Sequence, residues 1–592
     1  MSAAAIATVV FCGPLALVTH FAAKRKRMKT GIRQVLCGGV CALACVAVAE
    51  ENAAPADELA RQKVEAQVPD APEGYRRPKD WKPVLYPRDL RTLAREESAD
   101  QMARAKKLME RVDKVNREGK WHADAASIDR HRCPEWFVDA KLGIFIDWGP
   151  WSLASWCPYK EGARLYPDWY EFRCGTKADH IPYHERNWGK DFRRDHFLDL
   201  FRASRFDAPA LMKVFRECGA RYVIPFLKHH GGYCLWDSSF TFRDSMDQGP
   251  HRDLAKEMAD ACRAEGLRFG LYTSQCGEWE YPILQDDGSV RMYVETRPVL
   301  KPCTPDMEWK ASGKVPVRDF VRDYLVPQTV EFIDKYDPDI VWGDYDWATE
   351  AAKNGSYDIA AYLYNHAEGR KEVAVNDRLG CGTPEEIARW KSKRSRLIGS
   401  RTLRGDYYTD ESGDTAKDLS PATWHPWEEC TGISLAYGNH WQVDNPESVL
   451  SERDFICLFS DIVAKGGNLL LLVNLDPQGA IPEVQRQRLL QIGEWLDGNG
   501  EAIYGTRICA PYSTETVDYT RSKDGRTVYA IVKKSSAKLK LACDLPVNAV
   551  VSSLRSGERL ETAEDGRTVI LPASLRESPL PVCLKITAYN KP

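Results

Sequence analysis

The sequence lacks several of the short motifs that mark common classes of protein. None of the cysteines after residue 49 forms a CxxC pair, which argues against a zinc ribbon or a thioredoxin-like site. No GxGxxG loop occurs, so nothing indicates a dinucleotide-binding fold. The formal net charge is only -3 and no Lys/Arg stripe follows the leader, so no nucleic-acid partner is expected. Internal repeats are absent as well, and the 43% hydrophobic and 28% charged residues are typical of a globular protein.

Acidic side chains are missing from residues 1–49, which carry six Lys and Arg residues. Counted from Met28, a charged segment precedes the apolar run of residues 35–49, which ends in the small-residue motif Ala47-Val48-Ala49. This pattern predicts a signal peptide cleaved after Ala49, and hence a periplasmic or secreted protein.

The stretch before Met28 has two interpretations. In the first, translation begins at Met28 and residues 1–27 are a mis-assigned extension. In the second, the apolar residues 3–23 form an N-terminal membrane anchor. Apart from this anchor, no stable membrane partner is expected. Export is compatible with disulfides among the later cysteines, but their spacing defines no pairing, and buried free thiols account for most of them.

The remainder divides into three parts by composition. Residues 50–125 predict an N-terminal linker followed by charged surface helices. From 126 to 504, short apolar runs alternate with segments of helical periodicity, which predicts an α/β fold with a parallel sheet covered by helices, specifically a (β/α) barrel. The runs are 142–149, 221–232, 268–275, 339–345, 373–377 and 468–477, and the helical segments include 252–265, 318–335 and 482–497.

The pattern of apolar and polar residues changes in residues 505–592. Alternating segments such as 527–534, 538–545, 548–554 and 567–572 are separated by turns containing Gly, and no helix-length pattern lies between them. This predicts a small antiparallel β-sandwich domain after the barrel.

Polar side chains follow several of the predicted barrel strands. Asp147, the pair His229–His230, Asp344 and Arg378 each come at the end of an apolar run. Since the carboxyl ends of barrel strands form the active site, these side chains are expected to converge there. For Asp344 the alternative is a buried salt bridge with Arg378. A metal site at His229–His230 is not expected, because adjacent strand residues point to opposite faces.

A second acidic candidate lies in the segment TWHPWEECTG, residues 423–432. Glu428 follows Trp427, and an acid beside aromatic surface tends to have a raised pKa. Cleavage of a glycosidic bond needs one ionised and one protonated carboxyl group, so Asp344 and Glu428 are the predicted pair. In the alternative, Glu428 is a plain helix or loop charge and Glu429 is the functional acid. Trp427 either stacks on a sugar or packs in the core.

At this point the chain is identified by resemblance. It is similar to the retaining α-L-fucosidases, a glycoside hydrolase family, in segments that run in order from residue 136 to about 507. The matching segments are WFVDAKLGIFIDWGPWS (136–152), DWYEF (168–172), FDAPALMKVFRECGARYVIPFLKHH (206–230), GLYTS (270–274), YDPDIVWGDYDW (336–347), VNDRLG (375–380), WHPWEECTGISLAYG (424–438) and DIVAKGGNLLLLVNLDPQGAIP (461–482). The resemblance implies a barrel followed by a β-sandwich, retention of configuration, a fucosylated oligosaccharide or polysaccharide as substrate, and no metal or organic cofactor.

The resemblance also implies roles for individual residues. It makes Asp344 the nucleophile and Glu428 the acid/base, with Asp346 a structural acid in the loop with Tyr345 and Trp347. The residues that it places around the sugar are Trp169, Tyr170, His229, His230, Tyr272 and Arg378, with Trp427 as a further candidate.

Three departures from the family pattern fall among the sugar-contacting positions. The family reads FIHWG, KHHDGF and EWY, whereas this chain has Asp147, Gly231 and Asp168 at the variable positions. Because an Asp in place of His exchanges a donor and acceptor for an acceptor at neutral pH, the recognised sugar is open to change. Three functions are therefore compatible with the sequence: an exo-acting α-L-fucosidase for fucose or a modified fucose, a retaining glycosidase for another sugar such as galactose, or a non-catalytic glycan-binding protein.

Overall fold

The structure is a computed structural model, and it describes the following residues: 68–83, 86–159, 164–274, 278–293, 300–304, 310–344, 350–379, 405–411, 424–443, 445–542 and 548–588. The predicted leader with its cleavage site after Ala49 lies outside these ranges, and so do Tyr345, Asp346 and Trp347. Within them, every helix falls short of the length and apolar character needed to cross a bilayer.

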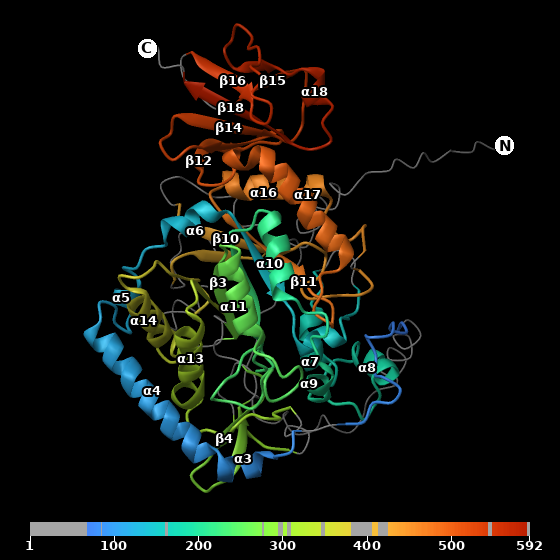
Figure 1. The fold of residues 1–592 in the computed structure, drawn as a ribbon, viewed down its shortest axis with the longest axis vertical. Coiled ribbons are helices and arrows are strands. Elements are labelled where there is room, and N and C mark those ends of the chain that lie inside the picture. Colours follow the sequence, from blue (N-terminus) through green and yellow to red (C-terminus); the bar gives the residue numbers. More distant parts are fainter. Residues whose placement is uncertain are drawn as a thin grey trace, which may run out of the picture.

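An eight-stranded sheet forms the centre of the molecule (Figure 1). Its spatial order is β8-β7-β3-β2-β1-β11-β10-β9, and every neighbouring pair is parallel. The strands are β1 (Leu142–Asp147), β2 (Tyr222–Lys228), β3 (Arg268–Ser274), β7 (Ile340–Asp344), β8 (Ala374–Val375), β9 (Tyr408–Asp410), β10 (Trp427–Gly432) and β11 (Asn468–Asn474).

The two edges of this sheet meet. Asp406 donates its backbone N–H to Val375 O at 2.8 Å, and Asp377 donates to Tyr407 O at 3.1 Å. These bonds join the end of β8 to the start of β9, so the sheet curls round on itself as a (β/α) barrel requires. The predicted barrel is therefore supported, and each apolar run picked out in the sequence contains one of its strands.

Helices cover the outer face of the sheet, as the periodic segments predict. They include α10 (Ala208–Glu217), α11 (Leu254–Ala264), α13 (Val326–Tyr336), α14 (Ser356–Ala367), α16 (Glu452–Ala464) and α17 (Glu483–Asn499). Shorter helices elsewhere in this part of the chain are α5 (Ala125–Ile128), α6 (Glu135–Ala140), α7 (Tyr170–Arg173), α8 (Ile181–Asn187) and α9 (His196–Leu200). Local sequence fixes their starts: Asp207 and Asp253 each accept a backbone N–H from the first turn of the helix that follows.

Side chains alternate between the barrel interior and the helices. On β7, Ile340 and Trp342 belong to an inner cluster that also contains Phe145, Tyr272 and Leu472. The intervening Val341 belongs to the outer cluster that packs against the helices. The same alternation carries Asp344, the last residue of β7, onto the inner face at the carboxyl end of the barrel.

The N-terminal helices and an extra sheet lie outside the barrel. α3 (Leu90–Glu96) and α4 (Ser98–Glu118) run along one side, where α4 packs against α13 and α14 (Figure 1). A three-stranded antiparallel sheet of β4 (Tyr281–Leu284), β5 (Val290–Tyr293) and β6 (Leu300–Pro302) was not predicted.

After the barrel the chain forms antiparallel strands, with α16 and α17 between them and the barrel (Figure 1). One sheet has the order β12-β13-β14-β18-β16, and β15 pairs with β17 separately. The strands are β12 (Arg507–Ser513), β13 (Val517–Arg521), β14 (Thr527–Val532), β15 (Lys538–Lys540), β16 (Ala549–Ser553), β17 (Thr568–Ile570) and β18 (Val582–Ala588), and α18 (Ala573–Arg576) is a single turn. Both sheets contribute to one apolar core, which partly matches the predicted β-sandwich.

Candidate active site

Asp344 lies among donors at the carboxyl end of the barrel. Tyr272, on the inner face of β3, donates its hydroxyl to Asp344 Oδ2 at 2.8 Å. Arg378, which follows β8, places Nη1 3.2 Å from Asp344 Oδ1. His230 Nε2 lies 3.8 Å from Oδ2, and the other ring nitrogen of His230 is 2.9 Å from Ser274 Oγ. The alternative of a salt bridge between Asp344 and Arg378 is thus also present in the geometry.

Arg378 connects Asp344 to a carboxylate that the sequence analysis did not select. The same nitrogen, Nη1, lies 2.5 Å from Glu411 Oε1, while Nε donates to Thr409 Oγ1 at 2.7 Å. Both carboxylates contact the same nitrogen atom. The distance between Asp344 Oδ1 and Glu411 Oε1 therefore cannot exceed the sum of the two contact distances. That limit is compatible with the roughly 5–5.5 Å separation of the two carboxyl groups in retaining glycosidases.

Glu411 was missed because its strand is short. β9 has only three residues, and it follows a charged stretch that carries no apolar periodicity. A signal was nevertheless present: Tyr407, Tyr408 and Thr409 precede Asp410 and Glu411, which is the same pattern of a β-forming run ending in acids that singled out Asp344. The Glu411 side chain is 33% exposed, so it can reach both solvent and Arg378.

The structure corrects the prediction for Glu428. This residue is second in β10, near the amino end of the strand, and it is completely buried in the barrel interior. Tyr222, the first residue of β2, donates its hydroxyl to Glu428 Oε2 at 2.6 Å, and Trp342 Nε1 donates to Oε1 at 3.0 Å. Trp342 precedes Asp344 by two residues on the same face of β7, so Glu428 lies a layer deeper than Asp344 rather than beside it.

The pKa of Glu428 is raised, as expected from its sequence, but the cause is burial in the barrel core. Burial raises the pKa of Glu428 to about 7, against hydrogen bonds from Tyr222 and Trp342 that lower it. A carboxyl group surrounded by side chains on all sides has no route to a substrate. Its aromatic neighbours, which suggested a catalytic acid in the sequence, are instead the donors that make burial of the group tolerable.

Two further site predictions are corrected. Tyr170 is fully buried behind the pocket, where its hydroxyl lies 3.0 Å from His184 Nδ1. Trp427 faces the helices, and its Nε1 donates to Lys465 O at 3.1 Å. Both side chains pack in the core, and the sequence could not distinguish this from a sugar contact because aromatic rings serve both purposes.

On the other side of Asp344, the departures from the family pattern gather in one buried group. Asp147 Oδ1 accepts from Trp151 Nε1 at 2.7 Å, and Asp168 Oδ2 lies 3.5 Å from His229 Nε2. Burial raises the pKa of Asp147 to about 7, and burial together with the nearby Asp147 charge raises that of Asp168. Among the described residues, Asp147 Oδ2, Asp168 Oδ1 and His229 Nδ1 have no hydrogen-bond partner. The group therefore keeps unused acceptor and ring-nitrogen atoms at the carboxyl end of the barrel, although none of the three is exposed.

The space beside Gly231, the third departure, is occupied by a side chain from another segment, Glu171. A Cβ atom at this position would lie 2.8 Å from Glu171 Oε2. Glu171 sits in α7, three residues after Asp168, and burial raises its pKa to about 7. The chain has thus lost an acid after the two histidines and carries a different acid in the adjoining space.

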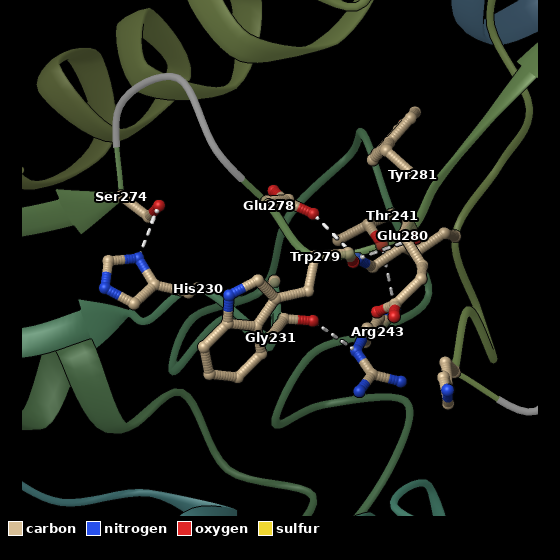
Figure 2. Close-up of polar contacts among 12 residues, drawn as sticks. His230, Gly231, Thr241, Arg243, Ser274, Glu278, Trp279, Glu280 and Tyr281 are labelled. Atoms are coloured by element: carbon tan, nitrogen blue, oxygen red, sulfur yellow. Dashed lines mark hydrogen bonds and ion pairs between the residues drawn. The ribbon is translucent and has the colours of Figure 1, made fainter. Parts of the chain in front are cut away.

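Aromatic rings pack around His230, next to Asp344. The Trp169 ring is centred 5.3 Å from His230 and 5.4 Å from Trp279. Figure 2 shows the Trp279 ring beside the His230 imidazole, with Glu278 and Glu280 on either side of Trp279 along the chain. Arg243 donates Nε to Gly231 O at 3.0 Å, which fixes the turn after the histidines (Figure 2).

Of the ten predicted site residues, the structure brings seven together around Asp344: Asp344 itself, Asp147, Trp169, His229, His230, Tyr272 and Arg378. Within the described ranges, no group of three or more His, Cys, Asp or Glu side chains is arranged to hold a metal ion. Ten of the cysteines that the structure describes are free thiols: Cys133, Cys157, Cys174, Cys218, Cys234, Cys262, Cys430, Cys457, Cys509 and Cys583.

A parallel barrel with two carboxylates on one arginine at the carboxyl ends of its strands is the arrangement expected of a glycoside hydrolase. The particular family follows from comparison: a model of the α-L-fucosidase family matches residues 108–501, and the chain belongs to that family. It is therefore an enzyme, a glycoside hydrolase.

Individual relatives agree with this assignment. The chain is 30% identical over 429 residues to plasma α-L-fucosidase of Rattus norvegicus, covering 72% of this chain and 82% of the relative. It is 29% identical over 426 residues to tissue α-L-fucosidase of Homo sapiens, covering 71% and 80%. Among solved structures, the Thermotoga maritima α-fucosidase in complex with a mechanism-based inhibitor has a TM-score of 0.61 at 29% identity, covering 79% of this chain and all of that one.

Proposed function

We propose that the protein is a retaining, exo-acting α-L-fucosidase that releases fucose or a modified fucose from glycans. Asp344 attacks the anomeric carbon to form a glycosyl-enzyme, and Glu411 protonates the departing oxygen and then deprotonates the incoming water. The observation that supports this pair is the single guanidinium nitrogen of Arg378 in contact with both carboxylates.

The surroundings of the two acids suit these different roles. Asp344 accepts a hydrogen bond from the Tyr272 hydroxyl and lies beside the Arg378 cation, and these two donors hold its carboxylate in place for attack on a sugar. Glu411 is more exposed, at the rim, where a leaving group departs and water enters. Double displacement at a sugar needs one ionised and one protonated carboxyl group about 5–5.5 Å apart.

The substrate class is carried over from the relatives. The Thermotoga maritima relative has also been solved in complex with fucose, and an α-L-fucosynthase from that organism in complex with α-L-Fuc-(1-2)-β-L-Fuc-N3. The proposal for this chain is a fucosylated oligosaccharide or polysaccharide. The altered residues Asp147, Asp168 and Gly231 lie on the sugar side of Asp344, so a galactoside is the second candidate. Turnover of 4-nitrophenyl galactosides without turnover of the α-L-fucoside would establish that version.

Trapping the intermediate tests the mechanism. A 2-deoxy-2-fluoro-fucosyl fluoride should inactivate the enzyme by losing its anomeric fluoride, and it should leave one 2-deoxy-2-fluoro-fucosyl group on the peptide that contains Asp344, as read by mass spectrometry of the digest. Asp344→Gly should abolish turnover of 4-nitrophenyl α-L-fucoside while keeping the native circular dichroism spectrum, and added azide should restore release of nitrophenol. A label on another peptide, or near-native turnover by Asp344→Gly, would show that the nucleophile is a different residue.

We further propose that the protein acts outside the cytoplasm, with a mature chain that starts at Glu50. Support comes from the charged segment, apolar run and Ala-Val-Ala motif alone. N-terminal sequencing of the protein from the periplasm and medium of an expressing bacterium tests this proposal. Recovery of uncleaved chain solely in the cytoplasm or in the membrane fraction would contradict it.

A further inference from the structure

A second cavity lies at the opposite end of the barrel from Asp344. It is open to solvent and has a volume of about 480 Å³ beneath the amino ends of the strands, where Lys141 directly precedes β1 and β12 begins the C-terminal strands. Its walls are formed by Val138, Lys141, Trp424, Gly466, Thr506, Arg507, Ile508, Cys509, Ala510, Tyr512 and Arg521. No Asp or Glu occurs in this lining.

Three buried polar atoms in the cavity wall lack a hydrogen-bond partner in the part of the chain that the structure describes. They are Lys141 Nζ, Trp424 Nε1 and Tyr512 Oη. A buried donor without a partner costs several kcal/mol, roughly 1–3 by mutational measurements. Three such atoms around one cavity indicate a shared missing partner, since amine and indole groups can only donate.

All the charged side chains in the cavity lining are basic. Lys141 is completely buried, and burial, followed by the charge of Arg507, lowers its pKa to about 7. Arg507 is itself neutralised by Asp139 at 2.7 Å and Glu135 at 2.9 Å, both outside the lining. Arg521 lies at the exposed edge and has no carboxylate partner among the described residues. Arg521 and the protonated form of Lys141 thus supply the positive charge of this cavity, and Asp139 is the acid whose charge acts on Lys141.

The aromatic side chains give the cavity a second property. Gly466, at φ +78°, lets the Trp424 indole approach so closely that a Cβ atom there would lie 2.4 Å from Nε1. Indole and phenol rings with free N–H and O–H groups present an apolar face and a polar edge together, which suits a sugar ring.

We propose that this cavity binds a sugar residue that carries a sulfate or carboxylate group. The oxyanion would accept from Lys141 and Arg521, and the Trp424 N–H and Tyr512 hydroxyl would bond to it or to neighbouring ring oxygens. Such a site would hold an acidic residue of a glycan on the face of the enzyme away from the catalytic pocket.

Isothermal titration calorimetry on the full chain tests the proposal with four probes: D-glucose 6-sulfate, D-glucuronic acid, D-glucose and inorganic sulfate. One or both acidic sugars should bind at millimolar concentration or tighter, and their identity distinguishes sulfate from carboxylate. Lys141→Met and Arg521→Gln should each weaken binding at least tenfold. Both variants should hydrolyse 4-nitrophenyl α-L-fucoside at the wild-type rate, because neither side chain is near Asp344. Arg521 is exposed, so its variant tests the site without disturbing the core.

The pH dependence gives an independent readout. An oxyanion favours the charged form of Lys141, so affinity should fall as the pH rises from 6 to 8, by up to about tenfold per unit, and Lys141→Met should remove this slope. Equal binding by wild type and both variants, or no binding of either acidic sugar, would overturn the proposal. Glucose or inorganic sulfate binding as tightly as the acidic sugars would overturn the assignment of an acidic sugar. Asp344→Gly should still bind the acidic sugar, so failure of the proposed hydrolytic mechanism is distinguishable from failure of this site.

Discussion

Tyr272 donates its hydroxyl to Asp344 Oδ2 at 2.8 Å, from the strand next to the one that Asp344 ends. A hydrogen bond to a charged group contributes about 1.5–3 kcal/mol. We expect Tyr272→Phe to lower kcat/KM for 4-nitrophenyl α-L-fucoside by roughly ten- to a hundredfold, because the nucleophile loses a fixed donor.

A matched control for this variant is present in the same barrel. Tyr222 also donates a hydroxyl to a buried carboxyl group, that of Glu428 at 2.6 Å. Tyr222→Phe should lower the free energy of unfolding by about 1–3 kcal/mol, measured by urea denaturation, with little change in kcat/KM. Equal losses of activity in the two variants would mean that the hydroxyls act on the overall packing rather than on catalysis.

Glu411 and Glu428 form a second contrasting pair. Glu411→Gln keeps the shape of the side chain and removes the proton that it exchanges, so kcat/KM for a fucosyl disaccharide should fall by roughly 10²–10⁴-fold. The loss should be smaller for 4-nitrophenyl α-L-fucoside, whose leaving group needs less help from an acid. Glu428→Gln should retain activity where it is folded and should show its effect in the melting temperature. A large loss of kcat/KM in Glu428→Gln, with activity retained in Glu411→Gln, would instead identify Glu428 as the acid/base.

These pairs show what the sequence could and could not reveal. The sequence pattern located β1, β2, β3, β7, β8 and β11 because each lies in a run of apolar residues long enough to stand out. β9 and β10 escaped because one has three residues and the other carries two glutamates. The rule that acids end barrel strands placed Asp344 at a strand end, and the structure has it as the last residue of β7, yet Glu428 stands near the start of its strand. Without the strand boundary, an acid that begins β10 and an acid that follows β9 look alike.

Asp147 should make stability depend on pH. Its ordinary pKa of 3.8 rises to about 7 on burial, so the folded state keeps a proton that the unfolded chain releases. Stability from this group is therefore present at low pH and is lost as the pH rises from about 4 to about 7. Asp147→Asn should flatten that part of the profile of melting temperature against pH. Asp287→Asn, at an exposed acid, should leave the profile unchanged, and an unaltered slope in Asp147→Asn would contradict the prediction.

Gly231 and Glu171 should behave as a coupled pair. A Cβ atom at Gly231 would approach Glu171 Oε2 to 2.8 Å, and an Asp there would add a second buried acid. We expect Gly231→Asp to lower the free energy of unfolding by about 1–3 kcal/mol, and Glu171→Ala in the same chain to recover much of that loss. A double-mutant cycle on urea denaturation measures the coupling. Simple addition of the two single effects would show that the carboxyl groups do not compete for the space.

Glu278 joins two buried lysines behind the pocket. Its carboxylate lies 3.2 Å from Lys228 Nζ and 3.0 Å from Lys314 Nζ, and all three side chains are buried. Although burial opposes the charge, the two lysines together hold the pKa of Glu278 below its ordinary value. The next residue, Trp279, packs against His230 (Figure 2).

Removing one member of this cluster should therefore affect both stability and the sugar pocket. Glu278→Gln leaves two cations without a counter-charge and should cost about 3–5 kcal/mol of unfolding free energy. Where the variant remains folded, KM for the fucoside should rise more than kcat falls, because Trp279 forms the pocket wall and does not touch Asp344. Adding Lys314→Met should recover part of the stability, since it removes one uncompensated charge. A Glu278→Gln variant as stable as wild type would show that the lysines are neutral in the folded protein, and the pocket wall would then be held by packing alone.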